Sequence, residues 1–409
     1  MSFDTLGLTP DLLTRVAEQG YTAPTPIQTE AIPHVLRGRD LMGLAQTGTG
    51  KTAAFGLPLV QLLNAAGRRP APKSAKALIL APTRELARQI SDTLNGFLAQ
   101  TRLNTAMVVG GTSINAQVKR MSRGTDILVA TPGRLLDLLD RRAIDLGQTQ
   151  FLVLDEADQM LDMGFIHALR RIAGLLPRKR QTLLFSATMP KQMAEIAAAY
   201  LTDPVRVEVA PPGRAADKIA QSVHFVPQGE KSALLKELLS GHPNQLALVF
   251  SRTKHGAERL MKSLVAAGFA ADSIHGNKNQ NQRDRALAAF RQGRTRVLVA
   301  TDVAARGIDI PEVRHVYNYD LPNVAENYVH RIGRTARAGA HGAAIAFCTK
   351  DEMGALRDIE KVMGRGIEVA GGTPWAVEPP RKQQAQKRGN GGGGRRRSRS
   401  RSGGQRKAA

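Results

Sequence analysis

LMGLAQTGTGKTAAFGLPLVQLL, residues 41–63, is the stretch that sets the fold class. It opens with a short apolar run from Leu41 to Leu44, passes through a loop with glycine at positions 48 and 50, and continues into a long apolar segment that begins at Ala53. An apolar run of strand length, then a turn, then a segment of helix length is typical of a β–α unit with a strand buried on both faces. The stretch therefore predicts a parallel sheet covered by helices.

The same alternation of short apolar runs and amphipathic stretches continues on both sides of this unit. The strands expected are residues 41–44, 77–80, 105–109, 126–130, 151–154, 182–185, 246–250, 296–300, 314–319 and 343–348. Helical patterns cover residues 85–98, 134–139, 255–267 and 283–291. The series breaks at residues 203–217, which contain Pro204, Pro211, Pro212 and Gly213 and have the composition of a linker. We therefore predict an α/β protein with two tandem parallel-sheet domains, residues 1–205 and 219–370, joined by a short hinge at 206–218.

The C-terminal segment, residues 371–409, differs in composition. It loses apolar periodicity and contains a run of four glycines at 391–394 and an Arg-Ser run at 395–402. From Arg381 to Lys407 it carries eleven Lys or Arg and no Asp or Glu. Such a segment buries too little apolar surface to offset its ordering entropy, so we predict a disordered basic tail.

The charge balance indicates a polyanionic partner. The net charge is +23, of which 12 lies in the first 380 residues, so the body is basic without its tail. This favours nucleic acid or an anionic membrane, with a merely solvated basic surface as the alternative. No apolar run approaches the ~20 residues that span a bilayer, and the N-terminus lacks the features of a signal peptide. Cys348 is the single cysteine, which suits a reducing compartment. We expect a soluble, cytoplasmic protein without a membrane partner.

The loop after the first strand has the composition of a phosphate cradle. It fits the Walker A pattern, with alanine at the first position where glycine is usual, through Ala45, Gln46, Thr47, Gly48, Thr49, Gly50, Lys51 and Thr52. Glycines let backbone N–H groups wrap phosphate oxygens at the start of a helix. Lys51 is expected to reach the β- and γ-phosphates of ATP, and the Thr52 hydroxyl to ligate Mg²⁺. An ordinary glycine-rich turn is the alternative.

A second acidic motif strengthens the ATP site. Asp155, Glu156, Ala157 and Asp158 follow the apolar run 151–154. An Asp at the carboxyl end of a buried strand is where a residue that holds magnesium, partly through water, is expected. Glu156 beside it can polarise the attacking water, although an acidic helix cap is the simpler alternative. The two motifs together predict nucleotide binding.

From about Phe3 to Gly339 the chain resembles the DEAD-box RNA helicases. Residues 20–28 look like the Q motif (within residues 1–29), residues 155–158 supply the family's name, and residues 186–188 resemble its coupling motif. The resemblance implies two RecA-like domains. It also implies an adenine site in which Gln28 reads the base edge, Tyr21 stacks on its face and Phe3 is the upstream aromatic. Asp158, Ser186 and Thr188 would couple hydrolysis to strand separation.

The resemblance further assigns RNA contacts and the ribose contact. In the first domain the RNA-facing residues would be Pro82, Thr83, Arg84, Gly111, Thr131, Pro132, Gly133 and Arg134. In the second domain they would be Arg252 and Thr301, with Asp309 on the ATP ribose. Each first-domain loop follows an expected strand, and two of them open helices whose N-termini can hold phosphates. Simple turn and cap chemistry is the alternative for each loop taken singly.

The sequence 330–337 looks like the family's arginine-finger motif. Arg331, Arg334 and Arg337 are three residues apart and are expected on similar sides of a helical turn. Arg334 and Arg337 would reach the γ-phosphate as catalytic groups, unless the three form only a solvated basic face. Ala336 stands where the family often has glycine.

These observations together predict an ATP-dependent RNA helicase with ATP and Mg²⁺ as cofactors. RNA-stimulated hydrolysis would drive local, non-processive duplex unwinding or RNA–protein remodelling, with little sequence preference and with ribosomal particles or RNA-decay proteins as further partners. The compact core and short basic tail look most like the bacterial RhlE-type branch. The alternatives are an ATP-gated RNA clamp that seldom unwinds and a DNA-directed helicase.

Overall fold

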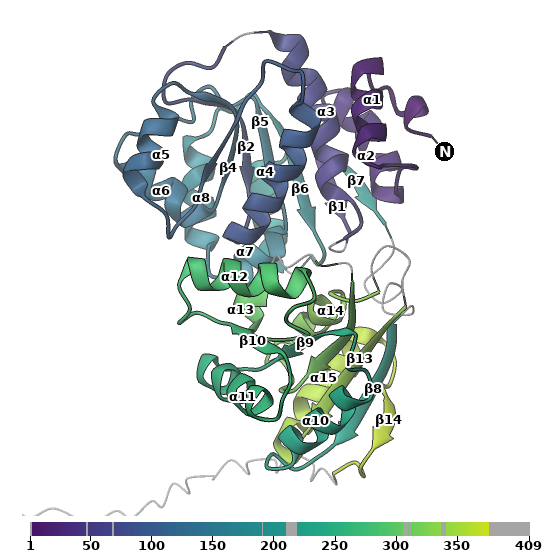
Figure 1. The fold of residues 1–409 in the computed structure, drawn as a ribbon. Helices are drawn as coiled ribbons and strands as arrows, with labels where there is room; N and C mark the ends of the chain where they lie inside the picture. The colour runs from purple at the N-terminus through teal and green to yellow at the C-terminus, as the bar shows by residue number, and fades with distance from the viewer. Residues whose placement is uncertain are drawn as a thin grey trace, which may run out of the picture. The chain divides into compact units, whose positions relative to one another are not determined.

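The computed structural model describes residues 2–45, 48–67, 69–189, 191–209, 219–305, 310, 312–336 and 341–375 (Figure 1). The chain divides into a unit from Met1 to Trp375 and a unit from Ala376 to Ala409. Within the first unit the strands form two seven-stranded sheets, each with its own helices, which we call lobe 1 and lobe 2. The expected tail lies outside the described residues from position 376 onward.

Lobe 1 is a parallel sheet in the order β3-β4-β2-β5-β6-β1-β7. Its strands are β1 (Leu41–Leu44), β2 (Ala75–Leu80), β3 (Thr105–Val108), β4 (Thr125–Ala130), β5 (Phe151–Leu154), β6 (Gln181–Ser186) and β7 (Val205–Glu208). Its helices are η1 (Phe3–Leu6), α1 (Pro10–Glu18), α2 (Pro26–Leu36), α3 (Lys51–Ala66), α4 (Arg84–Leu98), α5 (Ile114–Met121), α6 (Pro132–Asp140), α7 (Ala157–Asp162), α8 (Ile166–Leu175) and α9 (Lys191–Tyr200).

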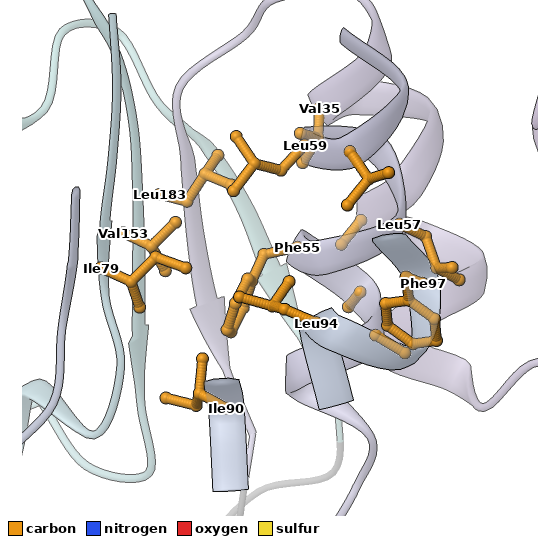
Figure 2. Close-up of a cluster of buried hydrophobic side chains, with 14 of the residues drawn as sticks. Val35, Phe55, Leu57, Leu59, Ile79, Ile90, Leu94, Phe97, Val153 and Leu183 are labelled. Carbon is orange, nitrogen blue, oxygen red and sulfur yellow. The ribbon is translucent and has the colours of Figure 1, made fainter. Parts of the chain in front are cut away.

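Helices cover both faces of this sheet, so its central strands are buried on both sides. Every residue of β2, β4 and β6 is buried. Figure 2 shows one face, where Phe55 of α3 and Leu94 of α4 lie against Ile79, Val153 and Leu183 of the strands. Gly43 of β1 makes this packing possible, because a Cβ there would lie 2.6 Å from the ring of Phe185. A second cluster under α6 to α9 fills the other face.

Lobe 2 is also a parallel sheet, in the order β10-β11-β9-β12-β13-β8-β14. Its strands are β8 (Ile219–Phe225), β9 (Leu246–Phe250), β10 (Ala271–Ile274), β11 (Val297–Ala300), β12 (Val313–Asn318), β13 (Gly342–Cys348) and β14 (Glu368–Gly371). Its helices are α10 (Lys231–Ser240), α11 (Lys254–Ala266), α12 (Gln280–Arg291), α13 (Asp302–Ala305), α14 (Glu326–Ile332), η3 (Lys350–Glu352) and α15 (Met353–Met363). If the strands of each lobe are counted from one to seven, both sheets have the same order, 3-4-2-5-6-1-7.

The ten strands expected from the sequence are all present, with ends shifted by at most two residues. Four further strands, β7, β8, β10 and β14, join them. Lobe 1 continues to Glu208, because β7 pairs with β1 through residues that we expected in the hinge. Residues 210–218 of that hinge lie outside the described part of the chain. Among the described helices, none combines the length and the apolar character that crossing a bilayer requires.

Candidate nucleotide and RNA site

The loop between β1 and α3 has the backbone of a phosphate cradle. Gly48 and Gly50 both adopt left-handed conformations, with φ of 84° and 87°, which a side chain disfavours. A Cβ at Gly50 would also overlap the amide of Gln28. Lys51 begins α3 directly after the loop, so the helix N-terminus faces it. The predicted residues Gln46 and Thr47 lie outside the described residues.

Lys51 and Asp155 lie together at the base of this loop, both buried. The Lys51 ammonium donates to the Ala45 carbonyl oxygen at 3.1 Å and lies 3.9 Å from Asp155 Oδ1. Burial raises the pKa of Asp155 to about 6, and the charge of Lys51 opposes that rise. The charge of Lys51 thus offsets only part of the effect of burial on the Asp155 carboxyl group. A cation bound nearby would favour the ionised carboxylate further.

A cavity of about 210 Å³ opens above these residues. The predicted residues that line it are Tyr21, Gly48, Gly50, Lys51, Thr52, Asp155 and Glu156. Sequence reasoning missed Ala53 and three residues of α4, namely Leu86, Gln89 and Thr93. The α4 residues are spaced three and four apart, so they share one face of that helix. The spacing predicts a shared helix face, but the sequence does not show that this face lies at the cavity, because that depends on the packing of α4 beside α3.

The predicted adenine-site residues are connected to the cradle. Gln28 is buried, its Oε1 accepts from the Thr25 N–H at 2.9 Å, and its Nε2 donates to the Gly50 carbonyl oxygen at 3.0 Å. This side chain therefore ties the start of α2 to the phosphate loop. Phe3 is buried behind Tyr21, with the two rings edge-on at 6.3 Å, and is not among the residues that line the cavity.

The acidic motif joins the cavity to the predicted coupling loop. Glu156 has a left-handed backbone with φ of 52° and is the residue that directly precedes α7. Two residues on, Asp158 Oδ2 accepts hydrogen bonds from the Ala187 N–H at 3.0 Å, the Thr188 N–H at 2.9 Å and the Thr188 hydroxyl at 3.0 Å. The Ser186 hydroxyl donates to the Thr188 carbonyl oxygen at 2.7 Å. These bonds join the acidic motif to the loop after β6.

The predicted RNA-facing loops of lobe 1 lie at the carboxyl ends of the neighbouring strands β2, β3 and β4. Thr83 caps α4 through a bond from the Leu86 N–H at 3.2 Å. The Arg84 guanidinium fills the space beside Gly111, where a Cβ would overlap it. Arg134 Nη1 donates to the Thr112 carbonyl oxygen at 3.1 Å.

The remaining predicted residues of these loops sit at the start of α6 or just before α4. Thr131, at the N-cap of α6, and Pro132 are buried, Gly133 is exposed, and Pro82 is buried ahead of Thr83. The structure thus brings together the guanidiniums and helix starts that the sequence assigned to RNA.

In lobe 2 the predicted residues again follow neighbouring strands. Thr301 comes directly after β11 and Arg252 two residues after β9. Arg252 is partly exposed and bonded to Glu352. The predicted ribose contact, Asp309, lies outside the described residues.

The expectation that three arginines share sides of one helical turn is wrong. Helix α14 ends at Ile332 with Gly333 as its C-cap, so Arg334 lies in the following turn. Arg331 points into the lobe, where it binds both oxygens of Asp302 at 2.5 and 2.8 Å and lies over the ring of Phe250. It is a structural residue.

Arg334 is almost fully buried, and its Nε donates to the His330 carbonyl oxygen at 3.3 Å. It lines a small cavity with His330 and Asn327. The second predicted finger, Arg337, lies outside the described residues. Ala336, the departure noted in the sequence, has a left-handed backbone with φ of 55°.

Comparison with known proteins agrees with this geometry. Residues 25–196 match the family model described as DEAD/DEAH box helicase, and residues 230–339 match the model described as helicase conserved C-terminal domain. The chain is 44% identical over 369 residues to the RNA helicase CrhR of Synechocystis, covering 90% of this chain and 74% of CrhR. It is 43% identical over 368 residues to the DEAD-box ATP-dependent RNA helicase CshA of Bacillus subtilis, with coverage of 90% and 74%.

Among solved structures, S. cerevisiae Dbp5 bound to RNA and ADP BeF3 superposes with a TM-score of 0.80 at 35% identity, covering 90% of this chain and 95% of Dbp5. Both lobes therefore have the RecA-like fold, and the glycine-containing loop after β1, the acidic motif and the loop after β6 lie together in lobe 1. The chain belongs to the DEAD-box family of ATP-dependent RNA helicases.

Proposed function

We propose that this DEAD-box helicase uses RNA-stimulated ATP hydrolysis for local, non-processive separation of short RNA duplexes or for remodelling of RNA–protein complexes. The observation that carries the proposal is the set of three hydrogen bonds from the loop Ala187–Thr188 to Asp158. Because Asp158 is two residues from Glu156 on the cavity wall, a change at the nucleotide is transmitted to the segment after β6.

The residues of the cavity fit ATP with Mg²⁺. Thr52 and Asp155 both line it, which supplies one hydroxyl and one carboxylate. Magnesium suits such a site, since it is commonly held by one or two carboxylates together with substrate phosphates and water. When bound, the ion would neutralise charge on the phosphates. The raised pKa of Asp155 supports this assignment, because the buried carboxylate lacks sufficient compensating charge in the free protein.

The chain's own groups account for the rest of the chemistry. Lys51 and the N-terminus of α3 bind phosphate oxygens, and Gln28 and Tyr21 orient the base. The Glu156 carboxylate orients the attacking water and takes up a proton from it. Arg334 and Arg337 of lobe 2 stabilise the charge that develops on the transferred phosphoryl group.

RNA would bind the loops at the carboxyl edges of the two sheets. Thr83, Arg84, Thr131 and Arg134 supply guanidiniums, hydroxyls and helix starts, which suit phosphates and 2′-hydroxyls rather than base edges. This chemistry predicts little sequence preference. Since neither lobe holds all the groups, RNA that bridges them would favour the arrangement that hydrolyses ATP.

Three finer assignments belong to this proposal. The short basic tail after a compact core supports the RhlE-type branch. The basic body supports ribosomal particles or RNA-decay assemblies as the places of action. The single, buried Cys348 supports work in a reducing cytoplasm.

The test is ATP hydrolysis by the full chain with single-stranded RNA, with DNA of the same sequence and with neither. We expect RNA to raise the rate at least about tenfold and DNA to do much less. Lys51→Ala and Glu156→Gln should abolish hydrolysis, whereas Lys262→Ala, an exposed matched control in lobe 2, should not. Equal stimulation by DNA would instead support a DNA-directed enzyme. Normal hydrolysis by either cavity variant would mean that the site is misassigned.

A further inference from the structure

Arg252 is held from behind by a group of charged residues in lobe 2. We call Lys231, Arg252, Asp320 and Glu352 the Glu352 cluster. Arg252 follows β9, Asp320 follows β12, Lys231 begins α10, and Glu352 ends η3. Strands β11, β9 and β12 are neighbours, so Arg252 and Asp320 lie at the same sheet edge as Thr301. In open parallel sheets this carboxyl edge is where ligands bind.

Glu352 is the hub of the cluster. One carboxylate oxygen, Oε1, accepts from Arg252 Nη2 and from the Leu321 N–H at 3.2 Å. The other, Oε2, accepts from Lys231 Nζ at 2.8 Å and from the N–H and hydroxyl of Thr349, both at 3.2 Å. Five donors on one buried carboxylate leave it a single orientation.

Lys231 fixes the charge balance of that hub. Its side chain is 0% exposed and lies 2.8 Å from Glu352 and 3.5 Å from Asp320. Its Nζ also donates to the Tyr319 carbonyl oxygen at 2.8 Å. A buried ammonium requires such partners, so the contact between Lys231 and Glu352 holds both side chains in place. Glu352 therefore keeps its position through Lys231, Leu321 and Thr349 whether or not Arg252 binds a ligand.

Arg252 has capacity left for a ligand. Its backbone N–H donates to Asp320 Oδ2 at 2.9 Å, and its Nη2 donates to Glu352 and, at 3.3 Å, to the Leu321 carbonyl oxygen. Within the part of the chain that the structure describes, no protein group accepts from its Nε or Nη1. The side chain is 42% exposed. One end of the guanidinium is thus anchored while the remaining N–H groups are available to solvent.

We propose that Glu352, locked by Lys231, is a positioning residue that holds the Arg252 guanidinium for a phosphate of the bound RNA. The inference rests on the proposed function, because it requires Arg252 to contact the bound RNA. Pre-orientation matters because a free arginine loses side-chain entropy when it binds, and an anchored one has already lost it. The phosphate can be accepted without displacing Glu352, since the two use different N–H groups.

The experiment measures affinity for a fluorescently labelled single-stranded RNA by anisotropy, with a non-hydrolysable ATP analogue present. Arg252→Gln should weaken binding about tenfold, the size expected for one charge-assisted contact. Glu352→Gln, which keeps the shape and removes the charge, should weaken binding about three- to tenfold. The double variant should bind as Arg252→Gln does, because Glu352 acts only through Arg252. In Glu352→Gln the loss should appear in the RNA concentration needed to stimulate hydrolysis and not in the hydrolysis rate at saturating RNA.

Two further variants separate positioning from folding. Lys231→Met with Glu352→Gln removes the buried pair together. Asp320 loses its ammonium neighbour but keeps the hydrogen bonds from the Ser251 hydroxyl and the Arg252 N–H, so this variant should fold and still bind RNA weakly. Glu360→Gln is the matched control, since its carboxylate accepts a backbone N–H from Ile367 at 3.0 Å and does not contact Arg252. It should bind RNA normally.

Three results would overturn the inference: unchanged RNA affinity in the Glu352 variants, additive losses in the double variant, or tighter binding. Tighter binding would mean that Glu352 competes with RNA for Arg252. Failure of the proposed function would give a different result. RNA would still bind, and the variants would still change its affinity, but RNA would not stimulate hydrolysis.

Discussion

Glu156 and Ala336 both hold left-handed backbone conformations, with φ of 52° and 55°. For a residue with a side chain this costs about 1–2 kcal/mol. At Glu156 the cost has a functional reason, because the conformation sets a carboxylate on the cavity wall at the start of α7. At Ala336 the side chain is only a methyl group, so the left-handed conformation positions no functional group there.

Ala336→Gly should therefore stabilise lobe 2. We expect the free energy of unfolding to rise by about 1 kcal/mol, since glycine adopts positive φ without strain. Urea unfolding followed by circular dichroism measures this. Gln100→Gly, at an exposed residue of lobe 1 with φ of 64°, should give a similar gain far from the site and serves as the control. A loss of stability in Ala336→Gly alone would show that the methyl group packs usefully.

Residues with distinctive local chemistry were predictable from the sequence. The glycines beside Lys51 and the acids after an apolar strand carry their signal in a few adjacent positions. Leu86, Gln89 and Thr93 do not, because they line the cavity only through the packing of α4 beside α3. The expectation that Arg331 shares a side with Arg334 and Arg337 was wrong for the same reason, because Asp302 and Asn318, distant in sequence, bind Arg331 inside the lobe.

Among the elements, strands with an apolar run were predictable, including β3 at a sheet edge, whereas strands with mixed composition were not, including β8 between β13 and β14. The strands β2, β4 and β6 are buried along their whole length because helices cover both faces, and each contains an apolar run of three or four residues. The edge strands β7 (VRVE) and β10 (ADSI) carry charged residues, and their pairing with β1 and β11 makes them strands. The helical pattern at 330–337 likewise could not show that α14 stops at Ile332.

The start of β12 carries a pH-sensitive pair. The rings of His315 and His242 are stacked at 3.6 Å, His315 Nε2 lies 2.6 Å from Gln245 Oε1, and His242 Nε2 lies 2.7 Å from the Tyr317 hydroxyl. Burial, with a smaller contribution from His242, lowers the pKa of His315 to about 4 from an ordinary value of 6.5. Between these two pH values His315 is protonated in the unfolded chain and neutral in the folded chain. Lobe 2 should therefore lose stability as the pH falls from about 6.5 towards 4, and its stability should be complete above that window.

His315→Gln should reduce this pH dependence. The comparison is the urea midpoint of each protein at about pH 7.5 and about pH 5, and the variant should lose less between the two because it cannot take up the proton. His167→Gln, at an exposed histidine of α8, should behave as the unaltered protein does. Equal losses in His315→Gln and the unaltered protein would exclude His315 as the source.

At the scale of the whole molecule, the repeat of one strand order in both lobes is the main structural fact. The same topology brings loops after corresponding strands to the carboxyl edge of each sheet, and the predicted ATP and RNA residues are distributed over those two edges. The sequence showed this repeat only as two series of alternating patterns, since strand order depends on long-range pairing.

The basic tail should add affinity that depends on salt and not on sequence. Deleting residues 381–409 removes eleven positive charges. We expect weaker RNA binding and a shallower slope of log affinity against log salt concentration, because fewer counterions are released. RNA binding between about 50 and 200 mM salt measures this slope. An unchanged slope would remove the tail from RNA binding.

Hydrolysis should need a guanidinium of lobe 2 beside the ATP held by lobe 1. The hydrolysis rate of Arg334→Gln at saturating ATP and RNA tests this requirement directly. We predict a fall of at least about a hundredfold while affinity for ATP stays within about twofold, because an arginine finger acts on the transition state. Hydrolysis by Arg334→Gln at the rate of the unaltered protein would contradict a catalytic centre shared by the two lobes.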